Sequence, residues 1–325
     1  MIYDVNFYTH ASNLTGFGHA SRCLKVAKRI RELMPELKIC FSGEFDEHAL
    51  SLMQNYFALV LCKNAASKVV VYDRMDDHEI PENYDVDLLN SVARNSDKVV
   101  FMANGLRPPK LPPGVVCIGY KLGGYEAYGP DVFWSLKFAP TEPNSKGTNK
   151  SNFGTTGSAL VALGGDRSNH KLKSVLRSLV NIKEIESINV LLSPVNPCDS
   201  PVSILPSRCK KKINFFSNVE DVHSMFSASQ IVVTSYGHLG YEAIASGSSV
   251  CLFGQKVFQS EFAKNLQEAG LCVAGGLLGQ ISEDTIVAAI LKTLEKSEML
   301  KQAPSTLIDE NGIDRIAHVI IKQLS

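Results

Sequence analysis

The sequence has no excess of charge of either sign, because its 33 lysines and arginines balance its 33 aspartates and glutamates. Proteins that bind duplex nucleic acid usually carry a basic excess that neutralises phosphates. One dense basic run occurs, at Arg208–Lys212, and such a run is more typical of a solvated loop before a strand. We therefore expect no nucleic-acid partner.

Paired cysteines and long apolar runs are also absent. None of the eight cysteines forms a CxxC pair, and most lie within apolar segments, which argues against a zinc site and against a secreted disulfide framework. Buried free thiols in a reducing compartment explain them more simply. No run of 18 apolar residues exists, and the first ten residues, MIYDVNFYTH, lack the basic start and apolar core of a signal peptide. We expect a soluble, cytoplasmic protein without a transmembrane segment.

What the sequence does contain is a regular alternation of short apolar runs with helical patterns. The run at 68–73, KVVVYD, is typical of a buried parallel strand, and 20–33 has the apolar spacing of an amphipathic helix. This alternation predicts an α/β protein whose parallel sheets carry helices on both faces. The expected strands are 2–8, 38–42, 68–73, 98–102, 159–163, 188–192, 213–216, 231–234 and 249–253. The expected helices are 20–33, 47–56, 85–94, 172–179, 222–228, 240–245, 259–269, 283–294 and 313–323.

The length of 325 residues favours two domains, since domains commonly have about 100–200 residues. The polar segment 141–157, TEPNSKGTNKSNFGTTG, has the composition of a loop or an interdomain linker. We predict an N-terminal α/β domain at 1–145 and a C-terminal α/β domain at 146–325. The last helix of the second domain could pack back on the first.

The first motif that could carry chemistry is TGFGHASR, Thr15–Arg22, between the first strand and the first helix. Gly16 and Gly18 allow a tight turn and a close approach of ligand, and the helix N-terminus beyond them offers free amides to an anion. His19 lies past the carboxyl end of a parallel strand, where such sheets bind their substrates. An imidazole there could act as a general base near neutral pH. The alternative is a capping loop whose histidine bonds only to backbone.

Two further glycine-bearing loops follow strands in the second half. Gly164 and Gly165 open the turn after 159–163, which could face a diphosphate or be only a tight turn. Ser235–Gly240 precedes a helix and could present amides to phosphate oxygens. Glu242, expected in the first turn of that helix, could bind ribose hydroxyls, and a favourable interaction with the helix dipole is the competing explanation.

An acid-rich cluster, YDRMDDH at Tyr72–His78, follows the strand at 68–73. A metal site and a substrate-hydroxyl site are both conceivable there, whereas loop solvation or helix capping explains most such clusters. Because helix N-termini can neutralise a diphosphate themselves, we expect neither a metal ion nor another cofactor. Activity should then survive excess EDTA.

At these motifs the sequence resembles the UDP-sugar hydrolases of the pseudaminic acid pathway and the related spore-coat polysaccharide biosynthesis proteins, which are relatives of the peptidoglycan N-acetylglucosaminyltransferase. Four stretches match in order: GFGHASR at 16–22, LVALGGDRSN at 160–169, the segment 213–247, and STLIDENGIDRIAHVI at 305–320. The resemblance implies the glycosyltransferase-B fold, in which two Rossmann-like α/β domains face a cleft. Residues 64–105 depart from the hydrolases and look more like the YD-x-x-D-D segment of certain glycosyltransferases.

The resemblance also implies roles for individual residues. His19 would be the general base that activates water. The sugar or acceptor side, in the first domain, would include Gly16, Gly18, Arg22, Asp73 and Asp76. The nucleotide side, in the second domain, would comprise Gly164, Gly165, Phe216, Ser217, Asn218, Ser235, Tyr236, Gly237, His238, Leu239, Glu242 and Gln255. Within that set, the backbone of 216–218 would pair with uracil.

The reaction that the resemblance implies is hydrolysis of a UDP-linked amino or deoxy sugar to the free sugar and UDP, in surface-polysaccharide or glycoconjugate biosynthesis. Two alternatives stay open. One is an inverting glycosyltransferase with a UDP-sugar donor, in which His19 deprotonates an acceptor hydroxyl instead of water. The other is a non-catalytic nucleotide-sugar-binding protein. The sequence does not predict an oligomeric state.

Overall fold

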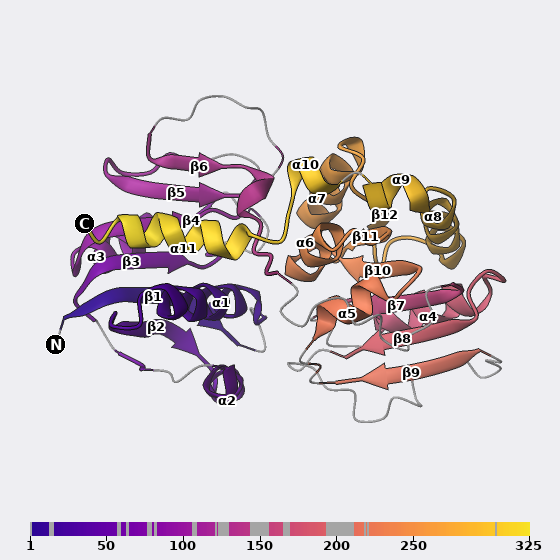
Figure 1. Ribbon diagram of the computed structural model, residues 1–325, viewed down its shortest axis with the longest axis horizontal. Coiled ribbons are helices and arrows are strands. Elements are labelled where there is room, and N and C mark those ends of the chain that lie inside the picture. The colour runs from indigo at the N-terminus through magenta and orange to yellow at the C-terminus, as the bar shows by residue number, and fades with distance from the viewer. Residues whose placement is uncertain are drawn as a thin grey trace. The chain divides into compact units, whose positions relative to one another are not determined.

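The computed structural model describes residues 2–12, 16–56, 60–62, 65–76, 80, 83–105, 109–120, 122, 130–143, 156–164, 170–192, 211–217, 219, 221–302 and 304–325. The chain divides into two compact units. The first is Met1–Glu142 together with Asn311–Ser325, and the second is Pro143–Glu310. Each unit is built on one six-stranded sheet (Figure 1). The prediction of an α/β protein with parallel sheets is therefore confirmed.

The sheet of the first unit has the strand order β2-β1-β3-β4-β5-β6, and its strand pairs are parallel. Chain direction along the sheet reverses between β1 and β3, so β1 and β3 flank a topological switch point. The strands are β1 (Tyr3–Ala11), β2 (Ile39–Phe45), β3 (Ser67–Asp73), β4 (Ser96–Met102), β5 (Val115–Gly119) and β6 (Val132–Trp134).

Helices cover both faces of this sheet. α1 (Gly18–Leu33), α2 (Glu47–Tyr56) and α11 (Gly312–Lys322) share one apolar core with the sheet, and α3 (Val86–Ala93) packs in a second core on the other face. A short 3-10 helix, η1 (Leu136–Phe138), lies just before Glu142, where the first of the two chain segments of this unit ends. α1 buries one stripe of side chains at helical spacing, as an amphipathic helix does.

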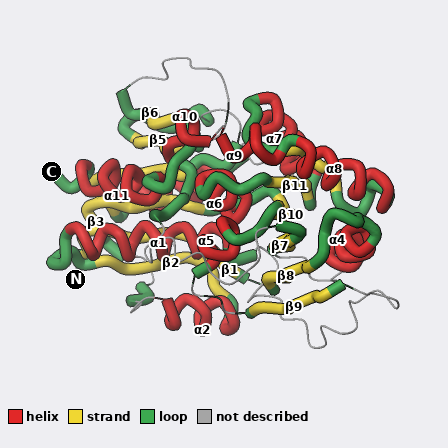
Figure 2. The backbone as a smooth tube through the Cα atoms, turned by 45° about the vertical axis from the view of Figure 1, so that its right-hand side comes forward, coloured by secondary structure: helices red, strands yellow, loops and turns green. Residues whose placement is uncertain are grey.

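The C-terminal helix α11 packs beside α1, although the whole second unit separates them in the sequence (Figures 1 and 2). Ile313, Ile316 and Ile320 are at most 2% exposed, and each buried isoleucine stabilises the contact by roughly 1.5–3 kcal/mol. The helix begins at Gly312, whose amide donates to Thr141 Oγ1 at 3.2 Å. An added Cβ at Gly312 would lie 1.6 Å from the carbonyl oxygen of Ala139, so this approach requires glycine.

The sheet of the second unit has the order β12-β11-β10-β7-β8-β9, again parallel, with its switch point between β10 and β7. The strands are β7 (Ser158–Ala162), β8 (Ser187–Leu191), β9 (Lys212–Phe216), β10 (Ile231–Ser235), β11 (Val250–Gly254) and β12 (Val273–Leu277). The helices are α4 (His170–Val180), α5 (Val222–Ser227), α6 (His238–Ala245), α7 (Val257–Glu268), α8 (Glu283–Glu295), α9 (Ser297–Gln302) and α10 (Pro304–Leu307). α4 and α8 share a core with one face of the sheet.

Three strands, β5, β6 and β12, are not predicted by the apolar pattern. β6 has only three residues, all half-buried, and β12 reads VAGGL, with two glycines inside a strand. An added Cβ at Gly275 would lie 2.1 Å from the ring of Phe253 on β11. Gly275 thus obscures the strand pattern in the sequence, and its lack of a side chain is what lets the ring of Phe253 pack there.

Candidate functional site

In the first unit, the carboxyl ends of the strands at the switch point carry the residues that the sequence singles out. Thr9 of β1 is paired with Asp73, the last residue of β3. α1 starts after β1, so its first turn lies above the same sheet edge. Gly16 sits in the intervening turn with a φ of 81°, and its amide donates to the carbonyl of Ser12 at 2.9 Å. Gly18 is the first residue of α1.

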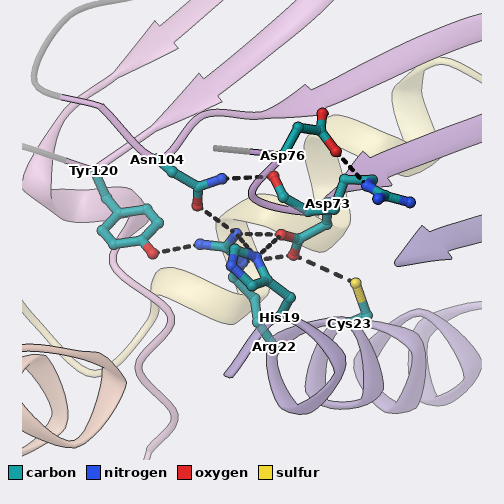
Figure 3. Close-up of polar contacts among 8 residues, drawn as sticks. His19, Arg22, Cys23, Asp73, Asp76, Asn104 and Tyr120 are labelled. Carbon is teal, nitrogen blue, oxygen red and sulfur yellow. Dashed lines mark hydrogen bonds and ion pairs between the residues drawn. The ribbon is translucent and has the colours of Figure 1, made fainter. Parts of the chain in front are cut away.

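Three side chains converge on the carboxylate of Asp73 through four contacts (Figure 3). His19 Nδ1 lies 2.7 Å from Asp73 Oδ1, and Arg22 Nη2 donates to the same oxygen. Arg22 Nε donates to Asp73 Oδ2 at 2.7 Å, and Cys23 Sγ donates to that oxygen at 3.4 Å. His19 and Arg22 are three residues apart on α1, which places both on the same face of the helix.

The guanidinium of Arg22 has further partners at the ends of the next two strands. Its Nη1 donates to the hydroxyl of Tyr120, which directly follows β5, and its carbon lies 5.2 Å from the centre of the Tyr120 ring. Its Nη2 donates to Asn104 Oδ1 at 3.3 Å, and Asn104 Nδ2 donates to the carbonyl of Arg74 at 2.8 Å. Helix α1 and the ends of β3, β4 and β5 thus all contribute to one polar cluster at the sheet edge.

Opposite charges hold this cluster in its ionised form. Burial alone would raise the pKa of Asp73, but the charge of Arg22 and the hydrogen bonds from Arg22 and His19 outweigh it, so the pKa lies well below its usual range. Burial alone would lower the pKa of Arg22, and the charge of Asp73 raises it above its ordinary value. Burial raises the pKa of Tyr120 and of Cys23, so phenol and thiol stay neutral.

The ionised carboxylate decides which nitrogen of His19 carries the proton. A carboxylate can only accept hydrogen bonds, so Nδ1 must be the donor in the 2.7 Å contact with Asp73. Neutral His19 then has its lone pair on Nε2. The ring of His10, on β1, meets the His19 ring edge-on with the centroids 5.1 Å apart. The geometry combines an imidazole acceptor with a carboxylate that fixes its tautomer.

Arg22 and Asp73 lie beneath His19. The side chains of both are 1% exposed, whereas that of His19 is 13% exposed. Buried side chains whose polar atoms are occupied by neighbours are not placed to touch a substrate directly. The structure therefore puts Arg22 and Asp73 behind His19, in contrast to the substrate contacts expected from the sequence.

Asp76 is also occupied by protein groups. Its Oδ2 accepts from the hydroxyl of Tyr72 at 2.7 Å and from the amide of Asp85 at 2.9 Å, and its Oδ1 accepts from Arg74. Asp85 in turn caps α3 through the amide of Leu88. Helix capping, which the sequence offers as the alternative for this acid cluster, accounts for these contacts. Among the residues that the structure describes, no group of three or more His, Cys, Asp or Glu could hold a metal ion; Asp77 and His78 lie outside them.

The residues expected on the nucleotide side gather at the corresponding edge of the second sheet. Gly164 follows β7 with a φ of 70°, which favours glycine. Ser235 Oγ donates to the carbonyl of Leu163 at 2.6 Å, and Gln255 Nε2 donates to the same carbonyl. The ends of β7, β10 and β11 are thereby tied together. Because the only hydroxyl proton of Ser235 is used in this bond, Ser235 Oγ cannot donate to a phosphate at the same time.

The loop after β10 differs from the sequence-based expectation in one respect. α6 begins at His238, not at Gly240, so Glu242 lies in the second turn and no acid lies in the first. The expected position of Glu242 in the first turn is therefore wrong, and the dipole explanation weakens because that effect falls off within one turn. Glu242 is 4% exposed. Tyr236 is buried, and its hydroxyl shares a hydrogen bond with that of Tyr241.

The remaining members of the nucleotide set lie at the same sheet edge or outside the described residues. Gly237 precedes α6 as its N-cap, and Leu239 is in its first turn. Phe216 ends β9, and its carbonyl accepts from the amide of Leu192 at 2.8 Å, while Ser217 is exposed. Gly165 and Asn218 lie outside the described residues.

Sequence reasoning misses Asn104, Tyr120 and Cys23. Asn104 has a usable signal, since it is a polar residue two positions after the buried end of β4. Tyr120 has none, because β5 itself is not expected and its partner Arg22 is 98 positions away. Within the described residues, no helix has the length and apolarity that crossing a membrane requires.

Comparisons with known proteins place the fold. No protein-family model matches the chain. An uncharacterized protein of Methanocaldococcus jannaschii, MJ1062, is 23% identical over 284 residues, which cover 78% of this chain. The chain spans about half the length, 56%, of this curated relative.

Solved structures match over nearly the whole chain. MnaA of S. aureus, solved with UDP, has a TM-score of 0.62 at 12% identity, with 99% of this chain and 97% of that chain covered. MurG of Acinetobacter baumannii has a TM-score of 0.59 at 12% identity, with 98% and 99% covered. The spinosyn rhamnosyltransferase SpnG, solved with spinosyn aglycone, has a TM-score of 0.59 at 11% identity, with 99% and 96% covered. The fold is that of the glycosyltransferase-B enzymes.

Proposed function

We propose that the protein is an inverting glycosyltransferase that takes its sugar from a UDP-sugar and transfers it to an acceptor hydroxyl. The observation that carries the proposal is the 2.7 Å hydrogen bond from His19 Nδ1 to Asp73, which is held ionised by Arg22. It leaves the lone pair of Nε2 on the one member of this trio that reaches the surface. A general base must offer such a lone pair to the proton that it removes.

In the proposed reaction, Nε2 of His19 accepts the proton of the acceptor hydroxyl while that oxygen attacks the anomeric carbon. The bond from this carbon to the diphosphate oxygen breaks, and its electron pair leaves with UDP. One displacement inverts the anomeric centre. Asp73 keeps the ring in place and fixes its tautomer, as the carboxylate does in other histidine dyads.

The nucleotide would bind at the edge of the second sheet, where backbone amides of the turn at Gly164 and of the first turn of α6 can hold a diphosphate. Glu242 and Gln255 remain candidates for the ribose and for the sugar hydroxyls. We assign the sugar or acceptor side to the first unit and the nucleotide side to the second. Arg22 and Asp73 serve His19, and Asp76 organises the start of α3.

The solved structures of similar fold favour transfer of the sugar over its hydrolysis. One solved neighbour of nearly equal extent is a rhamnosyltransferase with its aglycone, and another holds UDP. Segment 64–105, which supplies Asp73 and Asn104, resembles glycosyltransferases in its YD-x-x-D-D pattern. Nothing in the comparisons supports the expected hydrolase family or its pathway. The acceptor would belong to the class of surface polysaccharides or glycoconjugates.

The test is a panel of UDP-, dTDP- and CMP-sugars incubated with the protein, with and without candidate acceptors. Release of UDP that requires an acceptor is the expected result. Release of UDP at the same rate without any acceptor would mark a hydrolase and overturn the proposal. Tight binding of UDP-sugar with no release under any condition would mark a non-catalytic binding protein.

A further inference from the structure

The carboxylate of Asp73 that binds His19 is also paired with a positively charged group. Asp73 Oδ1, which accepts from His19 Nδ1, also accepts from Arg22 Nη2, and Arg22 Nε binds Oδ2 (Figure 3). Arg22 Nη2 itself lies 3.5 Å from His19 Nδ1. An imidazolium at this position would feel the carboxylate at 2.7 Å and the guanidinium at 3.5 Å. Coulomb energies vary inversely with distance, so the attraction and the repulsion largely cancel.

A histidine beside an unpaired carboxylate behaves differently. An opposite charge within about 4–6 Å favours the charged form of a titrating group by about 1–3 pH units. Such a histidine stays protonated up to a higher pH, and a protonated imidazole cannot accept another proton. The buried ion pair of Arg22 and Asp73 removes this penalty while it keeps the hydrogen bond that orients the ring.

We propose that Arg22 is a positioning residue that neutralises Asp73, so that Asp73 orients the imidazole of His19 without drawing a proton onto it. The inference rests on the proposed role of His19 as the base, and it adds a residue that sets the working pH of that base. Tyr120 and Asn104 support this role of Arg22. They accept hydrogen bonds from the two outer nitrogens of its guanidinium and hold it against Asp73.

The other groups that face His19 support a simple test. Asp73 contacts it from β3, Arg22 lies 3.5 Å from it on α1, and His10 meets it from β1. Cys23 contacts Asp73 and Tyr120 contacts Arg22, so both belong to the same cluster without touching His19 in these contacts. Burial raises the pKa of Cys23 and of Tyr120, so neither changes charge as a histidine titrates. His10 is observed in the same histidine spectra and can be followed separately.

The experiment is an NMR titration of the histidine ring signals, with His19 assigned from the spectrum of His19→Gln among the eight histidines. Arg22→Met should raise the pH midpoint of the His19 signal by about 1–3 units, since the carboxylate is then uncompensated. Arg22→Met combined with Asp73→Asn should bring the midpoint back to within about half a unit of wild type, because both charges are gone. Arg22→Lys keeps the charge and should leave the midpoint similarly close to wild type.

Two further variants keep the outcome decisive. Arg29→Met is the matched control, since Arg29 lies on the same helix but pairs with Asp314 at 2.7 Å on the surface, and it should leave the midpoint unchanged. If Arg22→Met does not fold, Asp73→Asn alone gives the opposite prediction, a midpoint lowered by about 1 unit or more, because Arg22 is then uncompensated. A midpoint that is unchanged in Arg22→Met, or in Asp73→Asn, would overturn the inference.

The titration is independent of substrate, so it separates this inference from the proposed function. A protein with no transferase activity could still show the shifts. Conversely, an active transferase whose His19 midpoint ignores Arg22 would keep the function and lose the inference. In an active enzyme, the acidic limb of the pH–rate profile should move with the His19 midpoint in Arg22→Met, which a merely structural role of Arg22 would not produce.

Discussion

The two units share one architectural plan and differ in the chemistry at the ends of their strands. Both have a six-stranded parallel sheet with a switch point. In the first unit this edge carries a buried ion pair, a histidine, a phenol and an amide that contact one another. In the second, the side chains of Ser235 and Gln255 donate to the backbone of Leu163, and the hydroxyls of Tyr236 and Tyr241 share a hydrogen bond.

This difference suggests a division of labour that follows from the cost of burying charge. A proton acceptor needs a fixed tautomer and a tuned electrostatic environment, and buried charges provide both only when they are paired. A diphosphate brings its own charge, and a helix N-terminus with a positive-φ glycine turn can bind it without any buried cation. The same sheet edge can therefore serve catalysis in one unit and binding in the other. The predictions that follow ask whether the two units really divide the work in this way.

The largest effect is expected for His19→Ala. General-base assistance contributes about 10²–10⁴-fold, so kcat should fall by that factor. KM for the UDP-sugar should change little if the other unit holds the nucleotide, as we propose. Steady-state kinetics with a saturating acceptor measure both constants. His318→Ala is the control, since this histidine of the same unit is 60% exposed on α11. A rise in KM with unchanged kcat would erase the distinction between the units.

Acid should act more strongly on the first unit than on the second. The pKa of Asp73 is lowered in the folded state, so between about pH 4 and pH 2 the unfolded chain binds a proton that the folded chain does not. The free energy of unfolding then falls by about 1.4 kcal/mol for each pH unit below about 4, or about 2–3 kcal/mol between pH 4 and pH 2. Denaturant unfolding at several pH values should show this slope in wild type and a smaller one in Arg22→Met/Asp73→Asn. Equal slopes would mean that the ion pair does not titrate with folding.

The packing of α11 in the first unit should contribute more to the free energy of unfolding than the loop before α6 does. Gly312→Ala places a Cβ 1.6 Å from the Ala139 carbonyl and should destabilise the protein by about 2–3 kcal/mol, as overpacking does. Gly237→Ala is the matched variant in the second unit, because its φ of 161° is extended and no atom lies within 4 Å of an added Cβ. It should cost less than about 0.5 kcal/mol. Thermal or chemical denaturation measures both, and equal losses would contradict the close contact at Gly312.

Much of the fold is predictable because the strands at the centres of the sheets are long, β-branched and bounded by polar turns. β3 and β10 are of this kind, and their ends place Asp73 and Ser235 correctly at the sheet edges. β12 is not predictable from periodicity, since the ring of Phe253 leaves no room for a side chain at Gly275. Such a requirement depends on a neighbouring strand and leaves no apolar pattern in the sequence.

Residues of the candidate site stand out in the sequence, but their contacts with one another do not. The sequence singles out His19, Arg22 and Asp73, yet it treats the last two as substrate contacts because burial is not visible in a motif. Arg22 and Asp73 are 51 positions apart, and only the pairing of β1 with β3 brings them together. The expected position of Glu242 is wrong by one turn because α6 begins at His238, two residues before the expected start at Gly240.

At the edge of the second sheet where we propose that the nucleotide binds, we expect Glu242→Ala to weaken UDP binding. A hydrogen bond to a charged group contributes about 1.5–3 kcal/mol, which corresponds to roughly 10–100-fold in Kd. Isothermal calorimetry with UDP measures the change. Because Glu242 is only 4% exposed, the isosteric Glu242→Gln serves as a second variant that keeps the packing and removes the charge. Wild-type affinity in both folded variants would remove Glu242 from the nucleotide site.

The smallest effect is expected for His238→Ala. This variant tests whether the second unit binds the nucleotide without taking part in proton transfer. His238 is the first residue of α6, in the loop that follows β10, so we expect it to contact the diphosphate and not to move protons. Loss of one hydrogen bond of about 0.5–1.5 kcal/mol should raise KM for the UDP-sugar by roughly 2–10-fold. kcat should stay near wild type. His238→Gln, which retains a donor but does not titrate, should recover most of the affinity. If His238→Ala instead loses turnover while His19→Ala keeps it, the base and the binder are reversed, and proton transfer belongs to the second unit.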